Sequence, residues 1–229
     1  MMKTLRTAAV ALGLVGSLAL VGCKNNVVFR EMGYDSYRQQ DFVTAAEHFQ
    51  VAVDKKPSDY RSQYYLGVSL LQLDKPIPAQ TPLEQALALR PDDPSWTARI
   101  ADSLAESYYR QERFETLYGF LDDQIATYNQ ASGDFLRKAK YLGLVGDADG
   151  QKTALQKAAF FALDGDTKPY LAIADFYESF NDTPNAIQAL RFALYEDGDD
   201  EVVKDRLRGL GIVPGPTVAE APPKPEILD

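Results

Sequence analysis

The sequence repeats itself with a period of 34 residues. Residues 42–57 align with residues 76–91, and like residues fall opposite each other: Ala45 and Ala79, Phe49 and Leu83, Ala52 and Ala86, Pro57 and Pro91. Small residues allow two helix backbones to approach closely, large residues fill the next layer, and proline ends a helix. A period of this length is typical of a repeat array, in which each unit covers the apolar face of its neighbour.

The pattern continues through the chain with small shifts. A small residue recurs at one position of each unit, at Gly33, Gly67, Ala105, Ala139 and Ala174. Four extra residues at 92–95 account for the shift before the third unit. We predict five units, at about 29–59, 60–94, 95–130, 131–166 and 167–198, followed by a capping helix at 199–210. Five prolines within residues 214–225 predict a disordered, partly extended tail at 211–229.

The period and the order small, large, small, proline resemble the tetratricopeptide repeat. The resemblance implies an all-α fold, an α-solenoid of about five helix pairs plus a C-terminal capping helix. An irregular helical bundle is the alternative, since Leu117 and Gln124 stand where the family prefers small residues. Pro82 would remove a backbone donor inside the second helix of unit two. We therefore expect that helix to start late, at the capping-box pattern Thr81-Pro-Leu-Glu84.

The first 22 residues have the layout of a signal peptide. Lys3 and Arg6 precede an apolar run at 7–21 that is 15 residues long, shorter than the roughly 20 that a spanning helix needs. The segment Leu20-Val21-Gly22-Cys23 resembles the lipobox of bacterial lipoproteins. That resemblance implies cleavage before Cys23, acylation of this cysteine, and a short lipidated tether at 23–28. Several acyl chains would hold the protein firmly on its membrane.

Lys24 follows the cysteine where an inner-membrane retention signal would commonly place Asp, so the resemblance favours the outer membrane, periplasmic face. The alternative is an ordinary secretory signal that ends beside an incidental cysteine.

Composition excludes several classes of function. The net charge of −9 becomes −11 once Lys3 and Arg6 leave with the signal, which argues against nucleic-acid binding. His48 is the only histidine, and no catalytic set, metal-ligand spacing or phosphate loop is present. We predict no cofactor, no metal site and no enzyme activity; an enzyme with an unrecognised site is the alternative of a different class.

Two acidic segments, residues 147–150 and 196–200, lack the spacing of a calcium loop. We interpret them as turns in which Asp caps the next helix and Gly adopts a left-handed conformation.

In tetratricopeptide proteins the first helix of each pair lines the concave face. Transferring those positions onto this chain gives a predicted partner-binding groove made of Arg30, Tyr34, Tyr37, Arg38, Arg61, Tyr64, Arg99, Tyr109 and Arg110. Arg and Tyr dominate binding hot spots, so we expect a protein or peptide ligand, extended or helical, that carries carboxylates. The resemblance to the carboxylate-clamp subfamily is partial, because Tyr34 and Tyr64 stand where polar amides are expected. These residues could instead be scattered solvated side chains, or Arg30 and Arg38 could touch anionic head groups.

Repeat lipoproteins of this kind resemble the pilotins of pilus and secretion machines and the lipoprotein subunit of the outer-membrane β-barrel assembly machine. The resemblance implies a scaffold or adaptor that recruits or positions envelope proteins. A self-associating structural lipoprotein is the alternative.

Overall fold

The computed structural model describes residues 25–89, 93–127 and 131–223, and in these residues the chain forms eleven α-helices and no strand. The prediction of an all-α fold is confirmed. In chain order the helices are α1 (Asn26–Arg38), α2 (Phe42–Lys55), α3 (Tyr60–Gln72), α4 (Pro76–Ala88), α5 (Pro94–Arg110), α6 (Phe114–Thr127), α7 (Ser132–Leu144), α8 (Ala148–Phe160), α9 (Lys168–Ser179), α10 (Thr183–Glu196) and α11 (Glu201–Gly209).

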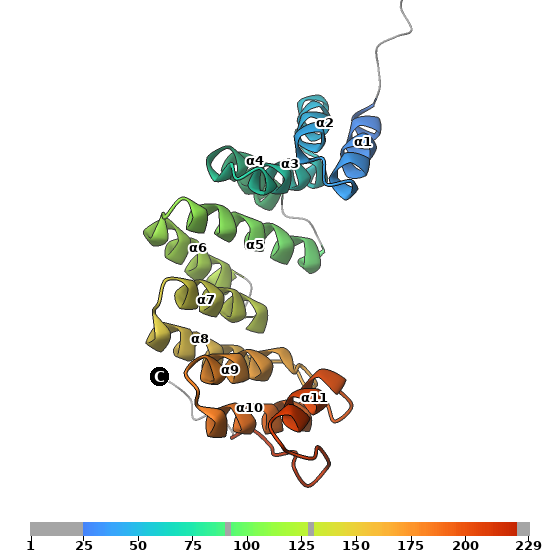
Figure 1. Cartoon of the computed structure of the whole chain (residues 1–229). Coiled ribbons are helices and arrows are strands. Elements are labelled where there is room, and N and C mark those ends of the chain that lie inside the picture. Colours follow the sequence, from blue (N-terminus) through green and yellow to red (C-terminus); the bar gives the residue numbers. More distant parts are fainter. Residues whose placement is uncertain (1–24, 90–92, 128–130, 224–229) are drawn as a thin grey trace, which may run out of the picture.

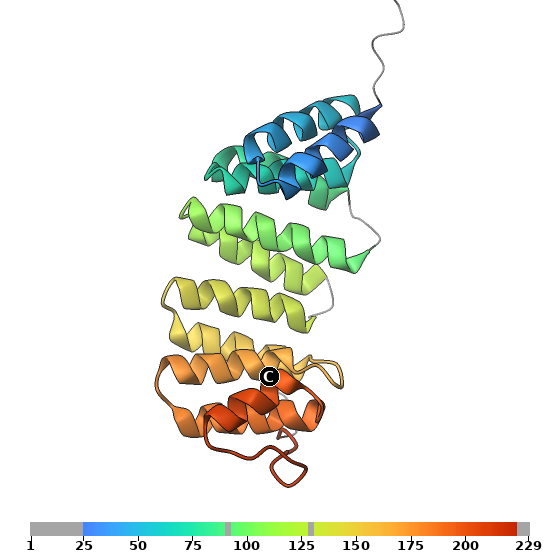
Figure 2. The same ribbon diagram turned by 45° about the vertical axis from the view of Figure 1, so that its right-hand side comes forward.

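The first ten helices form five pairs that stack in chain order (Figure 2). Each helix contacts the next, and α11 packs on α10 at the end of the stack. The stack is curved: in Figure 1 both of its ends, α1 and α11, lie to the right of the middle helices. The predicted solenoid with a terminal capping helix is therefore confirmed.

Spacing and capping explain why these segments are helices. In α2, Asp41 accepts a hydrogen bond from the backbone N–H of Thr44 (3.1 Å), which satisfies a free donor of the first turn. Ala45, Phe49 and Ala52 follow at helical spacing, and all three are fully buried. The small residues permit close approach between helices. A Cβ added at Gly67 of α3 would lie 2.5 Å from Leu83 Cγ of α4.

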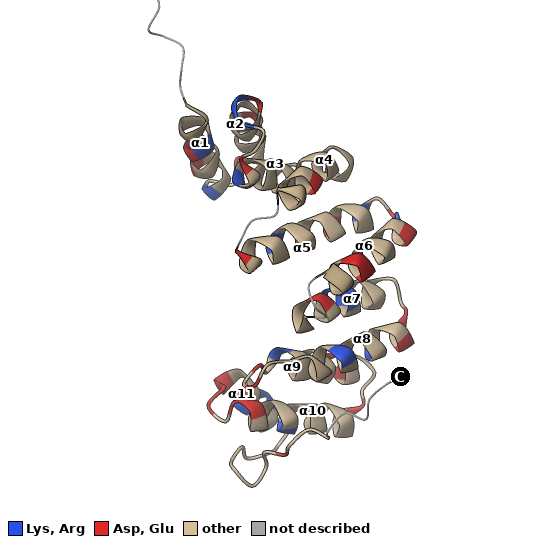
Figure 3. Cartoon of the chain, turned by 180° about the vertical axis from the view of Figure 1, so that it is seen from behind, with Lys and Arg blue, Asp and Glu red and all other residues tan. Residues whose placement is uncertain are grey.

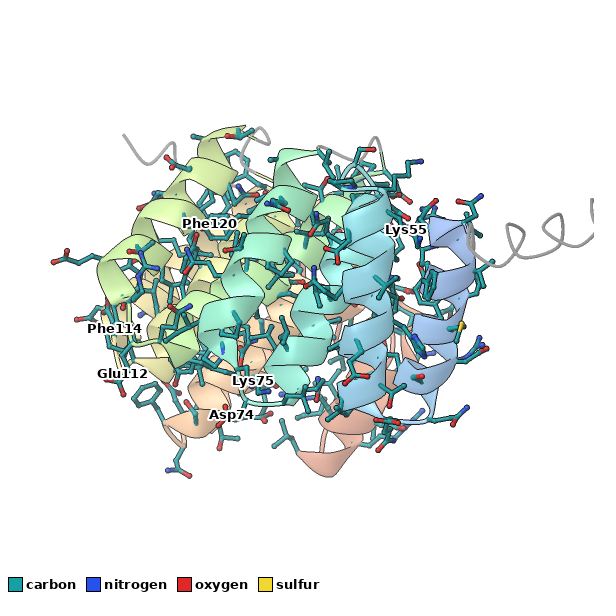
Figure 4. The ribbon with its side chains drawn as sticks, turned by 90° about the horizontal axis from the view of Figure 1, so that it is seen from above. Lys55, Asp74, Lys75, Glu112, Phe114 and Phe120 are labelled. Carbon is teal, nitrogen blue, oxygen red and sulfur yellow. The ribbon has the colours of Figure 1, made fainter. Side chains whose placement is uncertain are left out.

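The turn inside each pair has one repeated backbone feature. A residue with positive φ ends the first helix of every pair, namely Gln40, Asp74, Glu112, Gly146 and Asn181. Figure 4 labels Asp74 and Glu112, which lie along the same edge of the molecule. This recurrence of a left-handed residue at intervals of about 34 residues shows that the repeat in the sequence is also a repeat of the backbone.

The predicted late start of the second helix in unit two is wrong. Helix α4 begins at Pro76, whose missing N–H would have had no partner in the first turn anyway. Pro82 lies inside the helix and is buried. Burial of Ala79 and Leu83 from both halves of the helix explains why a continuous helix forms although one backbone hydrogen bond is lost.

The two acidic segments are turns, but their glycines are not the left-handed residues. Asp147 caps α8 by accepting from Gly150 N (2.9 Å), and Asp200 caps α11 by accepting from Val202 N (2.8 Å). Gly150 belongs to α8, and the left-handed glycine of that turn is Gly146, with φ of 84°.

The segment after α11 also differs from the predicted disorder. Residues 212–219 return to the last pair, where Ile212, Val218 and Ala219 pack against the apolar cluster of α9, α10 and α11. Arg191 of α10 donates to the carbonyl of Val218 (2.9 Å) and pairs with Glu220 (3.0 Å). The prolines disfavour a helix here, but a segment with a turn at residues 215–218 can still dock through its own apolar side chains. Residues 224–229 lie outside the described residues.

Candidate functional site

The first helices of the pairs form the inner side of the curved stack. Besides their sequence neighbours, α3 contacts α5, α5 contacts α7, and α7 contacts α9. In a curved stack of layers, neighbouring layers are closest on the inner side. The face on which the candidate groove was predicted is therefore the concave face of the described solenoid.

Trp96 is the centre of an aromatic cluster on this face. It lies in the first turn of α5, where Asp93 caps the helix by accepting from Ser95 N (2.9 Å) and Pro94 occupies the first helical position. Its ring meets the rings of Tyr60 and Tyr64 of α3 edge-on, with centroids 5.5 Å apart in both cases. The cluster therefore joins the second and third pairs.

Two arginines lie over the Trp96 ring. The guanidinium carbon of Arg61 lies 5.5 Å from the ring centroid, and that of Arg99 lies 5.6 Å from it. Both side chains are exposed, and neither forms an ion pair with a carboxylate of the described residues. Arg61 Nε also donates to the Tyr60 hydroxyl (3.3 Å), which fixes the guanidinium over the cluster. We call Tyr60, Arg61, Tyr64, Trp96 and Arg99 the Trp96 surface.

A second aromatic cluster supports the Trp96 surface from the first pair. Tyr65 of α3 contacts Tyr34 and Tyr37 of α1 edge-on and stacks on Phe49 of α2, at centroid distances of 4.7–5.4 Å. Burial raises the pKa of the Tyr34 hydroxyl to about 12 and also raises the pKa of Tyr37. Tyr34 and Tyr37 are thus packing residues that hold α1 against α3, although both were predicted as groove residues.

Three of the predicted groove arginines are engaged in ion pairs within the chain. Arg30 is largely buried and binds Asp59 (2.9 Å), while Arg38 is paired with Asp35 of the same helix. Arg110 pairs with Glu106 (2.7 Å) and donates to the carbonyl of Leu71 of α3 (2.9 Å). The Arg30 and Arg110 pairs are partly buried, whereas the Arg38–Asp35 pair is exposed. Each of these three arginines has a carboxylate partner, unlike Arg61 and Arg99.

A polar network crosses the inner face between the third and fourth pairs. Arg137 of α7 is buried and bridges Asp102 of α5 and Asp134 of its own helix. Tyr141 donates a hydrogen bond to Glu106 (3.2 Å). Burial by itself would raise the pKa of the Glu106 carboxyl, but the hydrogen bond from Arg110 and the charges of Lys140 and Arg110 hold this pKa below its usual value. Tyr109, another predicted groove residue, packs on the Tyr141 ring at 5.6 Å. This network fixes the relative position of two pairs.

The carboxyl-terminal half of the inner face is also neutralised internally. Arg206 of α11 reaches Asp175 and Glu178 of α9, at 2.8 Å each. Acidic residues gather around the start of α11 (Figure 3), where Asp199, Asp200 and Glu201 precede or begin the helix. Arg206 at this end therefore has carboxylate partners, whereas Arg61 and Arg99 of the Trp96 surface have none among the described residues.

The structure brings together Arg61, Tyr64 and Arg99 of the predicted groove and adds Tyr60, Tyr65 and Trp96, which sequence reasoning missed. Trp96 is the only tryptophan of the chain, and this is the feature of the sequence that could have pointed to the site. Helix α5 starts at Pro94, four residues earlier in its repeat than α3, because of the inserted residues. The extra turn carries Trp96, so the family's groove positions do not include it.

Stacked helix pairs, a 34-residue period and the small-residue positions define the class: the described chain is a tetratricopeptide-repeat solenoid. The sequence matches no protein-family model. It also matches no curated protein.

Solved structures with the same fold are similar to this chain. One is PilW, described as a widely conserved type IV pilus biogenesis factor, with a TM-score of 0.57 and 17% identity over 80% of this chain and 83% of that one. Another is MamA, from residue 41 to its end, of Desulfovibrio magneticus RS-1, with a TM-score of 0.55 and 13% identity over 78% of this chain and 98% of that one. A tetratricopeptide repeat protein from Parabacteroides merdae has a TM-score of 0.55 and 12% identity over 81% and 70% of the two chains. At these identities the likeness shows the fold.

Two kinds of feature are absent from the described part of the chain. No helix in it is long and apolar enough to cross a membrane. Among its residues, no group of three or more His, Cys, Asp or Glu side chains is placed to hold a metal ion. Cys23, the predicted lipidation site, lies outside the described residues.

Proposed function

We propose that this protein is a membrane-anchored scaffold that binds peptide segments of envelope proteins on its concave face, at the Trp96 surface. The observation that carries the proposal is the placement of two exposed arginines, without carboxylate partners in the described residues, over the Trp96 ring. Arg and aromatic residues dominate binding hot spots because they combine forked donors with rigid apolar area. The proposal includes no catalytic step.

The chemistry of the Trp96 surface selects the class of partner. Arg61 and Arg99 offer planar donors suited to carboxylates, and the partly exposed side chains of Tyr64 and Trp96 offer apolar contact. A peptide that places acidic side chains on both sides of an apolar residue matches this arrangement. The other cations of the inner face are bound to internal carboxylates, so they contribute little attraction.

The proposed anchor is a lipid on Cys23, with the solenoid on the periplasmic face of the outer membrane. The lipobox-like segment supports it, and so does the short interval of two residues between Cys23 and the start of α1. The likeness in fold to PilW, described as a pilus biogenesis factor, agrees with a role in the assembly of envelope machinery.

A crosslinking pull-down from membranes tests the proposal. The lipidated wild type is compared with the double variant Arg61→Glu, Arg99→Glu, and with the control Lys75→Glu, Lys157→Glu, which makes the same charge change at exposed lysines of other surfaces. We expect envelope proteins to be captured by the wild type and the control and lost with the arginine variant. Equal capture by all three proteins would refute the Trp96 surface as the site.

A synthetic peptide from the captured partner then gives a direct readout. Because Trp96 is the only tryptophan, its fluorescence reports on the site itself. Binding that quenches or shifts this emission, with a change that disappears in the arginine variant, supports the proposal. Binding without any change of the Trp96 emission places the partner elsewhere.

A further inference from the structure

The end of the first pair nearest the start of α1 combines exposed apolar side chains with exposed lysines. Val27 and Val28, in the first turn of α1, are 41% and 40% exposed. Lys55 and Lys56, at the end of α2, are also exposed. We call these four residues the first-pair tip.

The tip is a single surface although its residues come from two helices. Helices α1 and α2 run in opposite directions, so the end of α2 lies beside the start of α1; Figure 4 labels Lys55 there. The Lys55 ammonium lies 5.5 Å from the centroid of the Phe29 ring of α1. Lysines beside apolar residues at one helix end are typical of surfaces that meet a membrane interface.

The tip is basic within an acidic chain. Residues 53–58 contain two lysines and one aspartate, whereas the whole chain has a net charge of −9. Asp59, the next acid along the chain, is buried and neutralised: Arg30 binds it at 2.9 Å, and Asn26 donates to it at 3.2 Å. The exposed acids nearby are Asp54, which accepts a hydrogen bond from Gln50 (2.8 Å), and Glu31, which lies 3.7 Å from Arg30.

The chain upstream of the tip limits its distance from the proposed anchor. Four peptide steps separate Cys23 from Val27, at most about 14 Å when fully extended. The polar layer of a bilayer leaflet is itself about 5–8 Å thick. A lipid on Cys23 would therefore place the first turn of α1 within or next to the head groups.

We propose that the first-pair tip docks on an anionic lipid surface, with Val27 and Val28 at the head-group level and Lys55 and Lys56 against the lipid phosphates. This inference rests on the proposed lipid anchor but not on the Trp96 surface. Docking holds α1 and α2 with their tip ends at the membrane, so the opposite end of α1, with Arg38, faces away. The solenoid then has a fixed orientation on the membrane instead of turning freely on its tether.

The orientation can be measured with one fluorescent label per molecule. Acylation blocks Cys23, the only cysteine of the chain, so an introduced cysteine is the only reactive thiol. One label is placed at Ser58→Cys, 35 residues from Cys23 in sequence and next to the tip; the other is placed at Asp199→Cys, at the far end of the solenoid. The full lipidated chain is reconstituted into phosphatidylethanolamine vesicles with and without phosphatidylglycerol, and quenching by nitroxide-labelled lipid is recorded.

We expect the Ser58 label to be quenched on vesicles with phosphatidylglycerol and the Asp199 label to remain unquenched. A lysine near an anionic surface contributes roughly fivefold to association, so Lys55→Glu, Lys56→Glu lowers the ratio of docked to undocked molecules by about 20-fold or more. The control Lys75→Glu, Lys157→Glu leaves this ratio unchanged.

Equal quenching at Ser58 and Asp199, or quenching that the Lys55 and Lys56 changes do not affect, overturns the proposal. If quenching of the Ser58 label depends on the density of protein on the vesicle and not on lipid charge, the proposal is overturned, and a second copy of the chain occupies the tip. Failure of the wild type to float with vesicles shows instead that the anchor at Cys23 is absent, which separates failure of the anchor from failure of the tip. The pull-down with the arginine variant tests the Trp96 surface separately, and its outcome does not depend on whether the tip docks on lipid.

Discussion

At the scale of the residue, glycine sets how closely two helices of a pair approach. Gly67 of α3 faces the side chain of Leu83, which is fully buried in α4. A methyl group at position 67 would lie 2.5 Å from Leu83 Cγ, well inside van der Waals contact. The helices must therefore separate or Leu83 must change its rotamer if the glycine is replaced.

We expect Gly67→Ala to destabilise the protein by about 1–3 kcal/mol, because overpacking outweighs the gain in helix propensity. Urea denaturation measures the change. Gly119→Ala in α6 is the matched control: an added Cβ there meets nothing within 4 Å, so this variant gains roughly 0.5–1 kcal/mol. The double variant Gly67→Ala, Leu83→Ala loses less stability than the sum of the two single variants, because the smaller side chain at position 83 leaves room for the methyl group at position 67. If the stability changes of the two single variants simply add up in the double variant, positions 67 and 83 are not in contact.

The buried tyrosine rings predict a loss of stability at alkaline pH. Burial raises the pKa of Tyr34 to about 12, whereas an unfolded tyrosine ionises near 10. Below about pH 10 both states keep the proton and stability is unaffected. Above it the unfolded state loses its proton first, so the free energy of unfolding decreases as pH rises through the folded value.

Urea denaturation between pH 9 and pH 11 measures this decrease. Tyr34→Phe makes the decrease in the free energy of unfolding smaller, because phenylalanine has no hydroxyl proton to lose. Its ring preserves the contacts with Phe49 and Tyr65. Tyr195→Phe is the control, since this side chain is exposed in α10. A decrease of the same size in wild type and Tyr34→Phe argues against burial of the hydroxyl.

At the scale of the element, the fold was predictable where the repeat is regular and less so at the ends of helices. The small positions at Ala45 and Ala79 predicted the buried faces of α2 and α4 correctly. The predicted start of α4 is wrong because the backbone hydrogen bond lost at Pro82 is outweighed by the burial of Ala79 and Leu83 on both sides of it. Leu117 and Gln124 are buried in α6 although the family prefers small residues there. Long-range packing decided these cases, and it cannot be inferred from neighbours in sequence.

The docked segment after α11 supplies a prediction at this scale. Truncation after Val213 removes Val218, Ala219 and Glu220, uncovers part of α10, and costs roughly 1–2 kcal/mol through lost apolar burial. In a repeat array such a loss stays local, so amide exchange accelerates in α10 and α11 more than in α1 to α6. Truncation after Pro223, which removes only residues outside the described structure, is the control and leaves exchange unchanged. Identical exchange in both truncations means that the segment contributes no protection.

At the scale of the whole molecule, the sequence predicted the inner face but not the part of it that is free for a ligand. The predicted groove residues are spread over three pairs. Of their five arginines, Arg30 is paired with Asp59 at the start of α3, and Arg38 and Arg110 are paired with acids of their own helices. The Arg30–Asp59 pair depends on a contact between residues 29 apart in the sequence, which the fold alone brings together. The convergence of Arg61, Tyr64 and Arg99 on Trp96 likewise required the stacking of α5 on α3.

This distribution of charge leads to a prediction about ligand binding. The chain has a net charge of −9 and repels an acidic peptide at long range, while two exposed guanidinium groups attract it over the last few ångströms. The Debye length falls from about 10 Å at 0.1 M salt to about 3 Å at 1 M. Raising the salt concentration from 50 to 500 mM therefore weakens binding of a partner peptide several-fold. The main effect is faster dissociation, because salt screens the short-range ion pairs. The association rate changes less, because attraction and repulsion partly cancel.

Stopped-flow measurement of the Trp96 emission with a synthetic acidic partner peptide separates the two rates. In Arg61→Gln, Arg99→Gln the peptide binds more weakly and its dissociation rate becomes almost independent of salt, because the paired charges are gone. Lys75→Gln, Lys157→Gln changes the net charge equally but leaves the salt dependence of dissociation as in the wild type. If the lysine variant changes the salt dependence as strongly as the arginine variant does, net charge governs binding and the two arginines have no special role.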